Sequence, residues 1–101
     1  MTEVVIVKRG KLRSVSLNGH AGHGKRGADI VCAAISILCA ALDASCNGQP
    51  DYKSSGTGGS GEFFARYDGH SHEINAKFDM LITGLVLLEK TYPKNIKITT
   101  A

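Results

Sequence analysis

The stretch that decides the fold is residues 30–46, IVCAAISILCAALDASC, a run that contains neither glycine nor proline. Its alanines and apolar side chains predict a helix. Asp29 directly precedes this run and is a candidate N-cap, because a carboxylate accepts hydrogen bonds from the free amides of a first helical turn. Asn47 and Gly48 follow the run, with Pro50 just beyond, and predict its end.

Two segments before this helix alternate between apolar and polar residues. Residues 2–9 and 12–20 alternate loosely on either side of Gly10, which predicts two antiparallel strands joined by a turn. Residues 21–27 contain three glycines and predict a loop that leads into the helix.

The second half of the chain predicts strands around one more helix. Residues 51–61 are rich in glycine and serine; we interpret them as a flexible hairpin connection, with a disordered linker as the alternative. A strand is expected over 62–68, a helix capped by Ser71 over 72–92, where apolar residues recur every three or four positions, and a last strand over 96–99. The order predicts an α+β fold: a two-layer sandwich in which a mostly antiparallel sheet packs against two helices, with all 101 residues in a single domain.

The composition agrees with one small domain. The chain is 43% apolar, 21% charged and carries a net charge of +3, which suits an acidic or RNA-bound partner without requiring one. Three cysteines are an odd number for a disulfide framework, and the N-terminus has no signal-peptide pattern. The apolar stretch 81–88 is too short to span a bilayer, so we expect a cytoplasmic protein with reduced thiols.

Cys32 is the candidate nucleophile. It falls in the first turn of the predicted helix, where free amides and the partial positive charge of the helix end favour a thiolate. A nucleophilic cysteine also needs a base, and His20 ends the preceding predicted strand, from which the glycine-rich loop returns the chain to the helix. On spacing alone the alternative stays open that Cys32 is a small core residue, because reduced cysteines are commonly buried.

Asp29 has two possible roles next to this pair. It could cap the helix, or it could orient the imidazole of His20 as the third member of a triad does. Because its negative charge would oppose a thiolate at Cys32, we favour the cap and keep the orienting role as the alternative.

The remaining cysteines and histidines do not form a metal site in the sequence. Cys39 and Cys46 follow Cys32 at intervals of seven residues, so neighbouring thiols are separated by about 10 Å along the helix axis. One metal ion with sulfur bonds of about 2.3 Å cannot bridge them, and both are expected to pack in the core. The other histidines have no ligand spacing, and we expect neither a metal nor a cofactor.

A phosphate-binding loop is the third possibility for the glycine-rich segment. Residues 19–25 read G-x-x-x-x-G-K, but Arg26 stands where a serine or threonine would hold magnesium. A chain of this size cannot easily build a parallel nucleotide-binding sheet, so we do not expect nucleotide binding. Lys25 and Arg26 could still attract anions.

The pattern of Gly19-His20-Ala21-Gly22, Gly27 and Asp29-Ile-Val-Cys-Ala-Ala-Ile-Ser36 resembles the bacterial ribosomal-processing cysteine proteases, the Prp family. The resemblance extends to the chain length, the element order and the glycine-rich middle. It implies that His20 is the base, Cys32 the nucleophile and Asp29 the aspartate of the motif. It also implies a homodimer that removes a short N-terminal extension from a large-subunit ribosomal protein, cutting after two phenylalanines.

A hypothesis for the site follows. The loop residues Gly22, Gly24, Lys25, Arg26 and Gly27 cover the bound peptide, with the glycines allowing closure and the two cations steering the substrate. Amides of the helix start hold the oxyanion. No nucleic acid, membrane or cofactor is required. The alternative is a ribosome-associated binding module without enzymatic activity, in which the basic glycine-rich loop contacts RNA.

Overall fold

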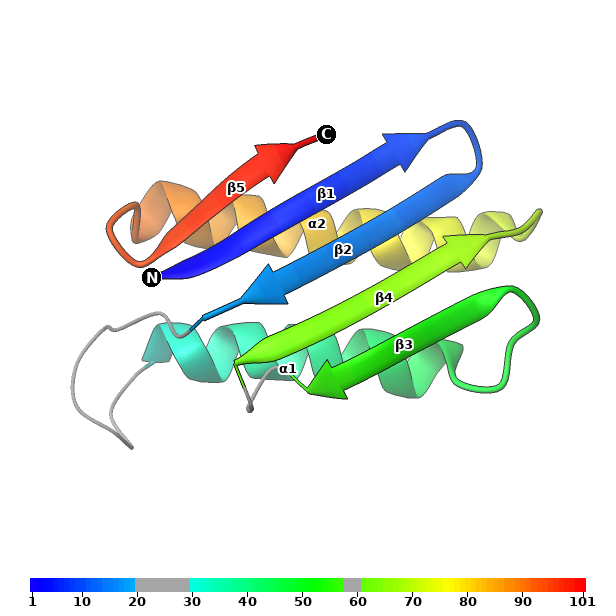
Figure 1. Ribbon diagram of the computed structural model, residues 1–101, viewed down its shortest axis with the longest axis horizontal. Helices are drawn as coiled ribbons and strands as arrows, with labels where there is room; N and C mark the ends of the chain where they lie inside the picture. The colour runs from blue at the N-terminus through cyan, green and yellow to red at the C-terminus, as the bar shows by residue number, and fades with distance from the viewer. Residues whose placement is uncertain (20–29, 58–60) are drawn as a thin grey trace.

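The computed structural model describes residues 1–19, 30–57 and 61–101 (Figure 1). In chain order the elements are β1 Thr2–Arg9, β2 Leu12–Asn18, α1 Ile30–Cys46, β3 Tyr52–Thr57, β4 Glu62–Asp68, α2 His72–Thr91 and β5 Ile96–Thr100.

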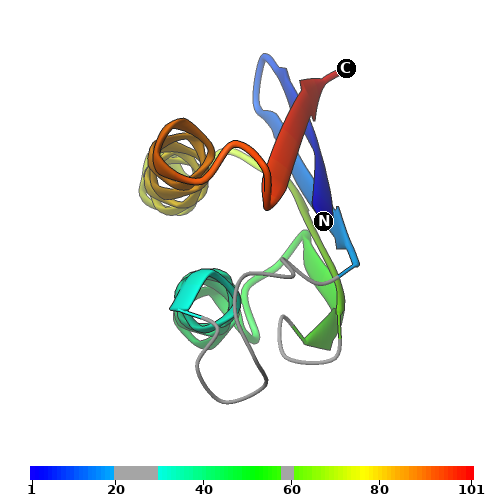
Figure 2. The same cartoon turned by 90° about the vertical axis from the view of Figure 1, so that its left-hand side faces the viewer.

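The strands form one sheet in the order β3-β4-β2-β1-β5. The pairs β1–β2, β2–β4 and β3–β4 are antiparallel, and β5 pairs with β1 in parallel. Both helices lie on the same face of the sheet, as the end view in Figure 2 shows, and they run in opposite directions (Figure 1). This arrangement confirms the predicted two-layer α+β fold.

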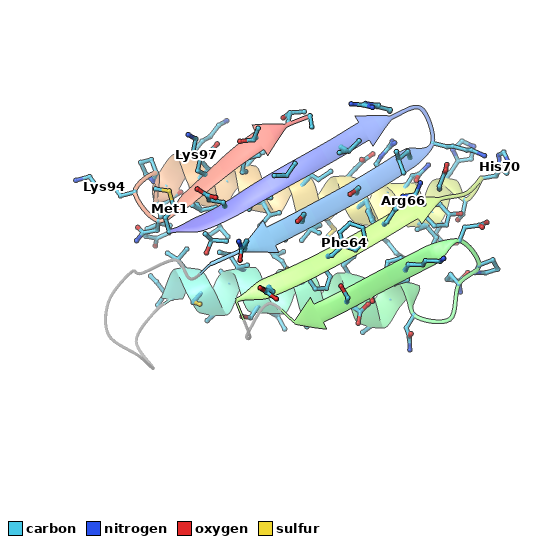
Figure 3. All side chains as sticks on the ribbon, viewed as in Figure 1. Met1, Phe64, Arg66, His70, Lys94 and Lys97 are labelled. Atoms are coloured by element: carbon cyan, nitrogen blue, oxygen red, sulfur yellow. The ribbon has the colours of Figure 1, made fainter. Side chains whose placement is uncertain are left out.

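The core lies between the sheet and the helix layer. Every second residue of a strand points toward the helices, and each helix turns its apolar residues, which recur about every 3.6 positions, toward the sheet. The fully buried side chains come from both layers and include Val4, Val15, Val31, Cys39, Phe78, Leu85 and Ile96. The other face of the sheet is open, and Phe64 and Arg66 project from it (Figure 3).

One charged side chain enters the space between the sheet and α2. Arg13 is only 8% exposed; its Nε donates to Asp79 Oδ1 at 3.0 Å and its Nη1 to the carbonyl oxygen of Gly10 at 2.7 Å. Lys8 Nζ lies 3.2 Å from the same Asp79 oxygen. This network joins the β1–β2 hairpin to α2 at the end of the sheet far from the start of α1 (Figure 1).

The predicted elements are largely confirmed. The helix of residues 30–46 has the expected bounds, Ser71 caps α2 by accepting the Ile74 amide at 3.2 Å, and Gly10 takes a positive φ in the β1–β2 turn. The second strand ends at Asn18 rather than at residue 20, because Gly19 has a φ of 94° that breaks the strand.

The main difference concerns the serine- and glycine-rich segment 51–61, which the sequence predicts to be a flexible hairpin connection. Tyr52–Thr57 forms β3, a full strand paired with β4. Serine and glycine have low strand propensity, so the tertiary structure supplies the stabilisation. Ladder hydrogen bonds to β4, together with hydrogen bonds from the side chains of Tyr52 and Ser54 to Asp43 of α1, hold this segment extended.

Candidate active site

Cys32 lies in the first turn of α1, as the third residue of the helix. Its side chain is half-buried against the core, and its thiol is in the reduced state. The first turn of a helix has amides without intrahelical acceptors and a partial positive charge, both of which stabilise an anion. The position therefore suits a thiolate that must still meet a substrate.

Gly19 fixes how the chain leaves β2. Its amide donates to the carbonyl oxygen of Gly61 at 2.8 Å, and its own carbonyl accepts from Thr2 Oγ1 at 3.4 Å. A Cβ at this position would lie 2.6 Å from the carbonyl oxygen of Met1, and φ is positive, so only glycine fits. The C-terminal end of β2 and the N-terminal end of α1 both lie at the same end of the molecule (Figure 1).

The other predicted site residues lie outside the described part of the chain. His20, Asp29 and the loop residues Gly22, Gly24, Lys25, Arg26 and Gly27 all fall within residues 20–29. The roles assigned to them, including the choice between capping and orienting for Asp29, stay predictions.

Cys39 and Cys46 are core residues, as the sequence predicts. Both side chains are fully buried. Burial raises the pKa of the Cys39 thiol to about 12 from 9.0, and burial also raises that of Cys46, against a smaller opposing effect of Lys77. Burial and a raised pKa both disfavour the thiolate that a nucleophilic cysteine requires.

The described residues contain no group of three or more His, Cys, Asp and Glu side chains that could hold a metal ion. His70 and His72 are exposed at the start of α2, as expected, and Lys11 Nζ lies 3.5 Å from His70 Nε2. The described strands also do not form the parallel sheet of a nucleotide-binding fold, since β1–β5 is their one parallel pair.

One contact of α1, about three turns from Cys32, is not predicted by the sequence. Asp43 Oδ1 accepts hydrogen bonds from Tyr52 Oη at 2.7 Å and from Ser54 Oγ at 2.6 Å, and these two donors lower the pKa of the carboxyl group. The contact ties β3 to α1. Its signal in the sequence was present, because Asp43 is the one charged residue within residues 30–46.

Comparison with known proteins decides between the remaining interpretations. The family model of the cysteine protease Prp matches residues 1–97. The chain belongs to the Prp family of cysteine proteases. It is 31% identical to the ribosomal processing cysteine protease Prp of Staphylococcus aureus over 101 residues, covering 95% of this chain and 93% of that protein.

Solved structures of the Prp family agree with the fold and the chemistry. The S. aureus Prp bound to a covalently linked product peptide matches this structure with a TM-score of 0.83 at 26% identity, covering 100% of both chains. The same protease in complex with a substrate peptide matches with a TM-score of 0.77, again at 26% identity and with 100% of both chains covered. These Prp relatives support the protease interpretation and not the non-enzymatic binding module.

Proposed function

We propose that this protease removes a short N-terminal extension from a large-subunit ribosomal protein, with Cys32 as nucleophile and His20 as general base. The observation that carries the proposal is the place of Cys32 in the first turn of α1, in a chain that the Prp family model matches over nearly its whole length. The S. aureus relatives are named for ribosomal processing, and one of them was captured with a substrate peptide.

The first half of the reaction forms an acyl-enzyme. His20 accepts the proton of the Cys32 thiol, and the thiolate attacks the scissile carbonyl carbon to form a C–S bond. Backbone amides at the start of α1 stabilise the negative charge that develops on the carbonyl oxygen. The carbonyl re-forms as the C–N bond breaks, and His20 gives its proton to the leaving amine.

The second half releases the product. His20 takes a proton from a water molecule, whose oxygen attacks the thioester. The C–S bond breaks, and the departing thiolate regains its proton from His20. Asp29 caps α1 and, in the alternative role, orients the imidazole. The residues Gly22, Gly24, Lys25, Arg26 and Gly27 cover the peptide, and the side chains before the scissile bond are phenylalanines.

A peptide that contains the extension and its junction tests the proposal. Cys32→Ala and His20→Ala should each abolish cleavage while the circular dichroism spectrum and the melting temperature stay close to those of the wild type. Cys39→Ala is the matched control, because it also removes a thiol of α1 but one that is buried. It should keep activity in proportion to its folded fraction. Full cleavage by Cys32→Ala would overturn the nucleophile assignment.

We further propose that the enzyme works as a homodimer through the outer face of its helix layer. Four large apolar side chains are exposed there: Ile30 at 57%, Ile37 at 65%, Met80 at 74% and Leu87 at 58%. Ile37, Met80 and Leu87 each follow a buried residue by two positions, so they point away from the sheet. Large apolar side chains that are exposed on one layer of the fold are typical of a protein interface.

Sedimentation velocity tests the dimer. The wild type should sediment as a dimer at micromolar concentration, and Ile37→Lys or Met80→Lys should shift it to the monomer. Val5→Lys, on the open face of the sheet, is the control and should leave the dimer intact. A wild type that is monomeric at high concentration would contradict the dimer.

We also propose that the enzyme acts in the cytoplasm, where ribosomes are assembled. Cleavage is proposed to need no nucleic acid. In the described residues no helix is both long and apolar enough to cross a membrane. Cleavage of the isolated peptide at an undiminished rate after nuclease treatment tests the second point.

A further inference from the structure

We propose that the peptide substrate binds as an additional strand on the outer edge of β3, along the flank of α1 that carries Cys32. This inference rests on the proposed protease function and adds the surface that holds the substrate backbone. Four observations carry it. Cys32 leaves α1 on the side of β3, and alternate backbone groups of β3 point away from β4. The side chains of β3 are mostly small, and β3 ends at the same end of the molecule at which α1 begins.

The flank of α1 that carries Cys32 faces β3. Cys32 and Asp43 are 11 residues apart, which is about three turns, so their side chains leave the helix in nearly the same direction. Asp43 points at β3, since its carboxylate accepts hydrogen bonds from Tyr52 at 2.7 Å and Ser54 at 2.6 Å. Cys32 therefore lies on the β3 side of α1, closer to the N-terminal end of the helix.

The opposite flank of α1 is occupied by α2. Leu38 lies against Gly84, where an added Cβ would come within 3.0 Å of the leucine methyl group. Further along the same flank, Lys77 Nζ donates to the carbonyl oxygen of Ser45 at 3.1 Å. A substrate that reaches the Cys32 thiol from beside α1 thus comes from the β3 side and not from the α2 side.

The outer edge of β3 presents backbone groups to such a peptide. β3 is the first strand in the sheet order, and among the described strands only β4 pairs with it. The Asp68 amide donates to the carbonyl oxygen of Asp51, so the amide and carbonyl groups of Lys53 and Ser55 also point toward β4. The amide and carbonyl groups of Ser54, which lies between these two residues, point away from β4.

The side chains of β3 leave this edge accessible. Proteins commonly protect edge strands with charged residues or proline. β3 has one charged residue, Lys53, no proline, and a run of Ser54, Ser55 and Gly56. An extended peptide can pair with such an edge through main-chain hydrogen bonds, which give affinity for the backbone while side-chain pockets give specificity.

The edge also leads to the nucleophile. β3 runs toward the end of the molecule at which α1 begins (Figure 1). A peptide segment that ends at the scissile bond and lies along this edge therefore runs parallel to β3 and arrives beside the first turn of α1. Each residue of it advances by about 3.3 Å, so a few residues suffice to follow the strand.

Backbone N-methylation of the substrate tests this geometry. In a strand that pairs on one side, alternate amides point toward the partner. Single N-methyl groups placed at successive residues before the scissile bond should raise KM about tenfold at every second position and leave the positions between nearly unchanged. Uniform tolerance, or uniform loss without alternation, would overturn the added strand. An unmodified peptide that is not cleaved at all would instead count against the proposed function.

A proline in β3 tests the same contact from the enzyme side. Ser54→Pro removes the outward amide and should raise KM about tenfold with kcat little changed. Ser54→Ala keeps the amide and loses only the hydrogen bond to Asp43, so its KM should stay near that of the wild type. Thr100→Pro is the matched control on the other edge of the sheet, where Thr100 also turns its amide outward, since the neighbouring Ala101 amide donates inward to Ile6.

A Ser54→Pro enzyme that folds and keeps the wild-type KM would contradict the proposal, as would an equal rise of KM in Thr100→Pro. If Ser54→Pro does not fold, which circular dichroism detects, the N-methyl series decides alone, because it uses the wild-type enzyme.

Discussion

The two halves of α1 contain the same kind of residue in different environments. Cys32, in the first turn, is half-buried beside helix amides, whereas Cys39, two turns on, is fully enclosed by the core. The second half also attaches β3 through Asp43. The helix consists mostly of alanine and apolar residues along its whole length. The different environments of the two thiols therefore come from what each turn of the helix packs against.

Alkylation should separate the two thiols most strongly. With iodoacetamide at a pH well below 8, Cys32 is expected to react at least about a thousandfold faster than Cys39, because burial raises the pKa of Cys39 to about 12 and excludes the reagent. Peptide mapping by mass spectrometry measures both rates in one sample. Comparable labelling of the two in the folded protein would remove the distinction.

Serine substitutions should sharpen the contrast in stability. Cys39→Ser places a hydroxyl group in an apolar core and should lower the free energy of unfolding by about 2 kcal/mol. Cys32→Ser should lower it much less, since the side chain is only half-buried, while cleavage is lost. Urea denaturation followed by circular dichroism gives both values.

The anchor between α1 and β3 should have a smaller effect. Tyr52→Phe removes the donor to Asp43 and should cost about 1 kcal/mol of unfolding free energy. The same substitution in an Asp43→Ala background should cost clearly less, because the partner is already absent. Equal costs in both backgrounds would show that this hydrogen bond contributes nothing.

The smallest expected effect is the acid dependence of that anchor. In the folded state, hydrogen bonds from Ser54 and Tyr52 lower the pKa of Asp43 below its ordinary value of 3.8. The pKa of Asp43 is lower in the folded state than in the unfolded state. Its contribution to the free energy of unfolding is therefore fully present above the unfolded pKa and is lost as pH falls through the folded pKa. Thermal melts between pH 5 and pH 2 should therefore fall more steeply for the wild type than for Asp43→Asn.

The local elements were largely predictable because their signals are local. The 30–46 run, the cap at Ser71 and the turn at Gly10 each depend on neighbours within a few residues, and all three are confirmed. β3 was not predictable in this way, since Tyr52–Thr57 has few strand-forming residues and is held by β4 and α1, which are distant in the sequence.

The candidate site likewise has features that were predictable from the sequence and features that were not. The motif around Cys32 predicted a cysteine protease, and the family match bears this out. The seven-residue spacing of the cysteines also predicted that Cys39 and Cys46 are core residues. The edge of β3 could not be found from the sequence, because its position beside α1 arises from hydrogen bonds between Asp43, Tyr52 and Ser54.

By itself, then, the sequence determined the helix that carries Cys32, the strands with clear alternation and the family, because periodicity, capping and a motif are written in consecutive residues. Only the tertiary structure decided that β5 pairs in parallel with β1, that a serine- and glycine-rich segment forms an edge strand, and that Asp43 of α1 faces that strand. Strand order and the direction of a helix face depend on which surfaces pack together, and packing is a property of the whole chain.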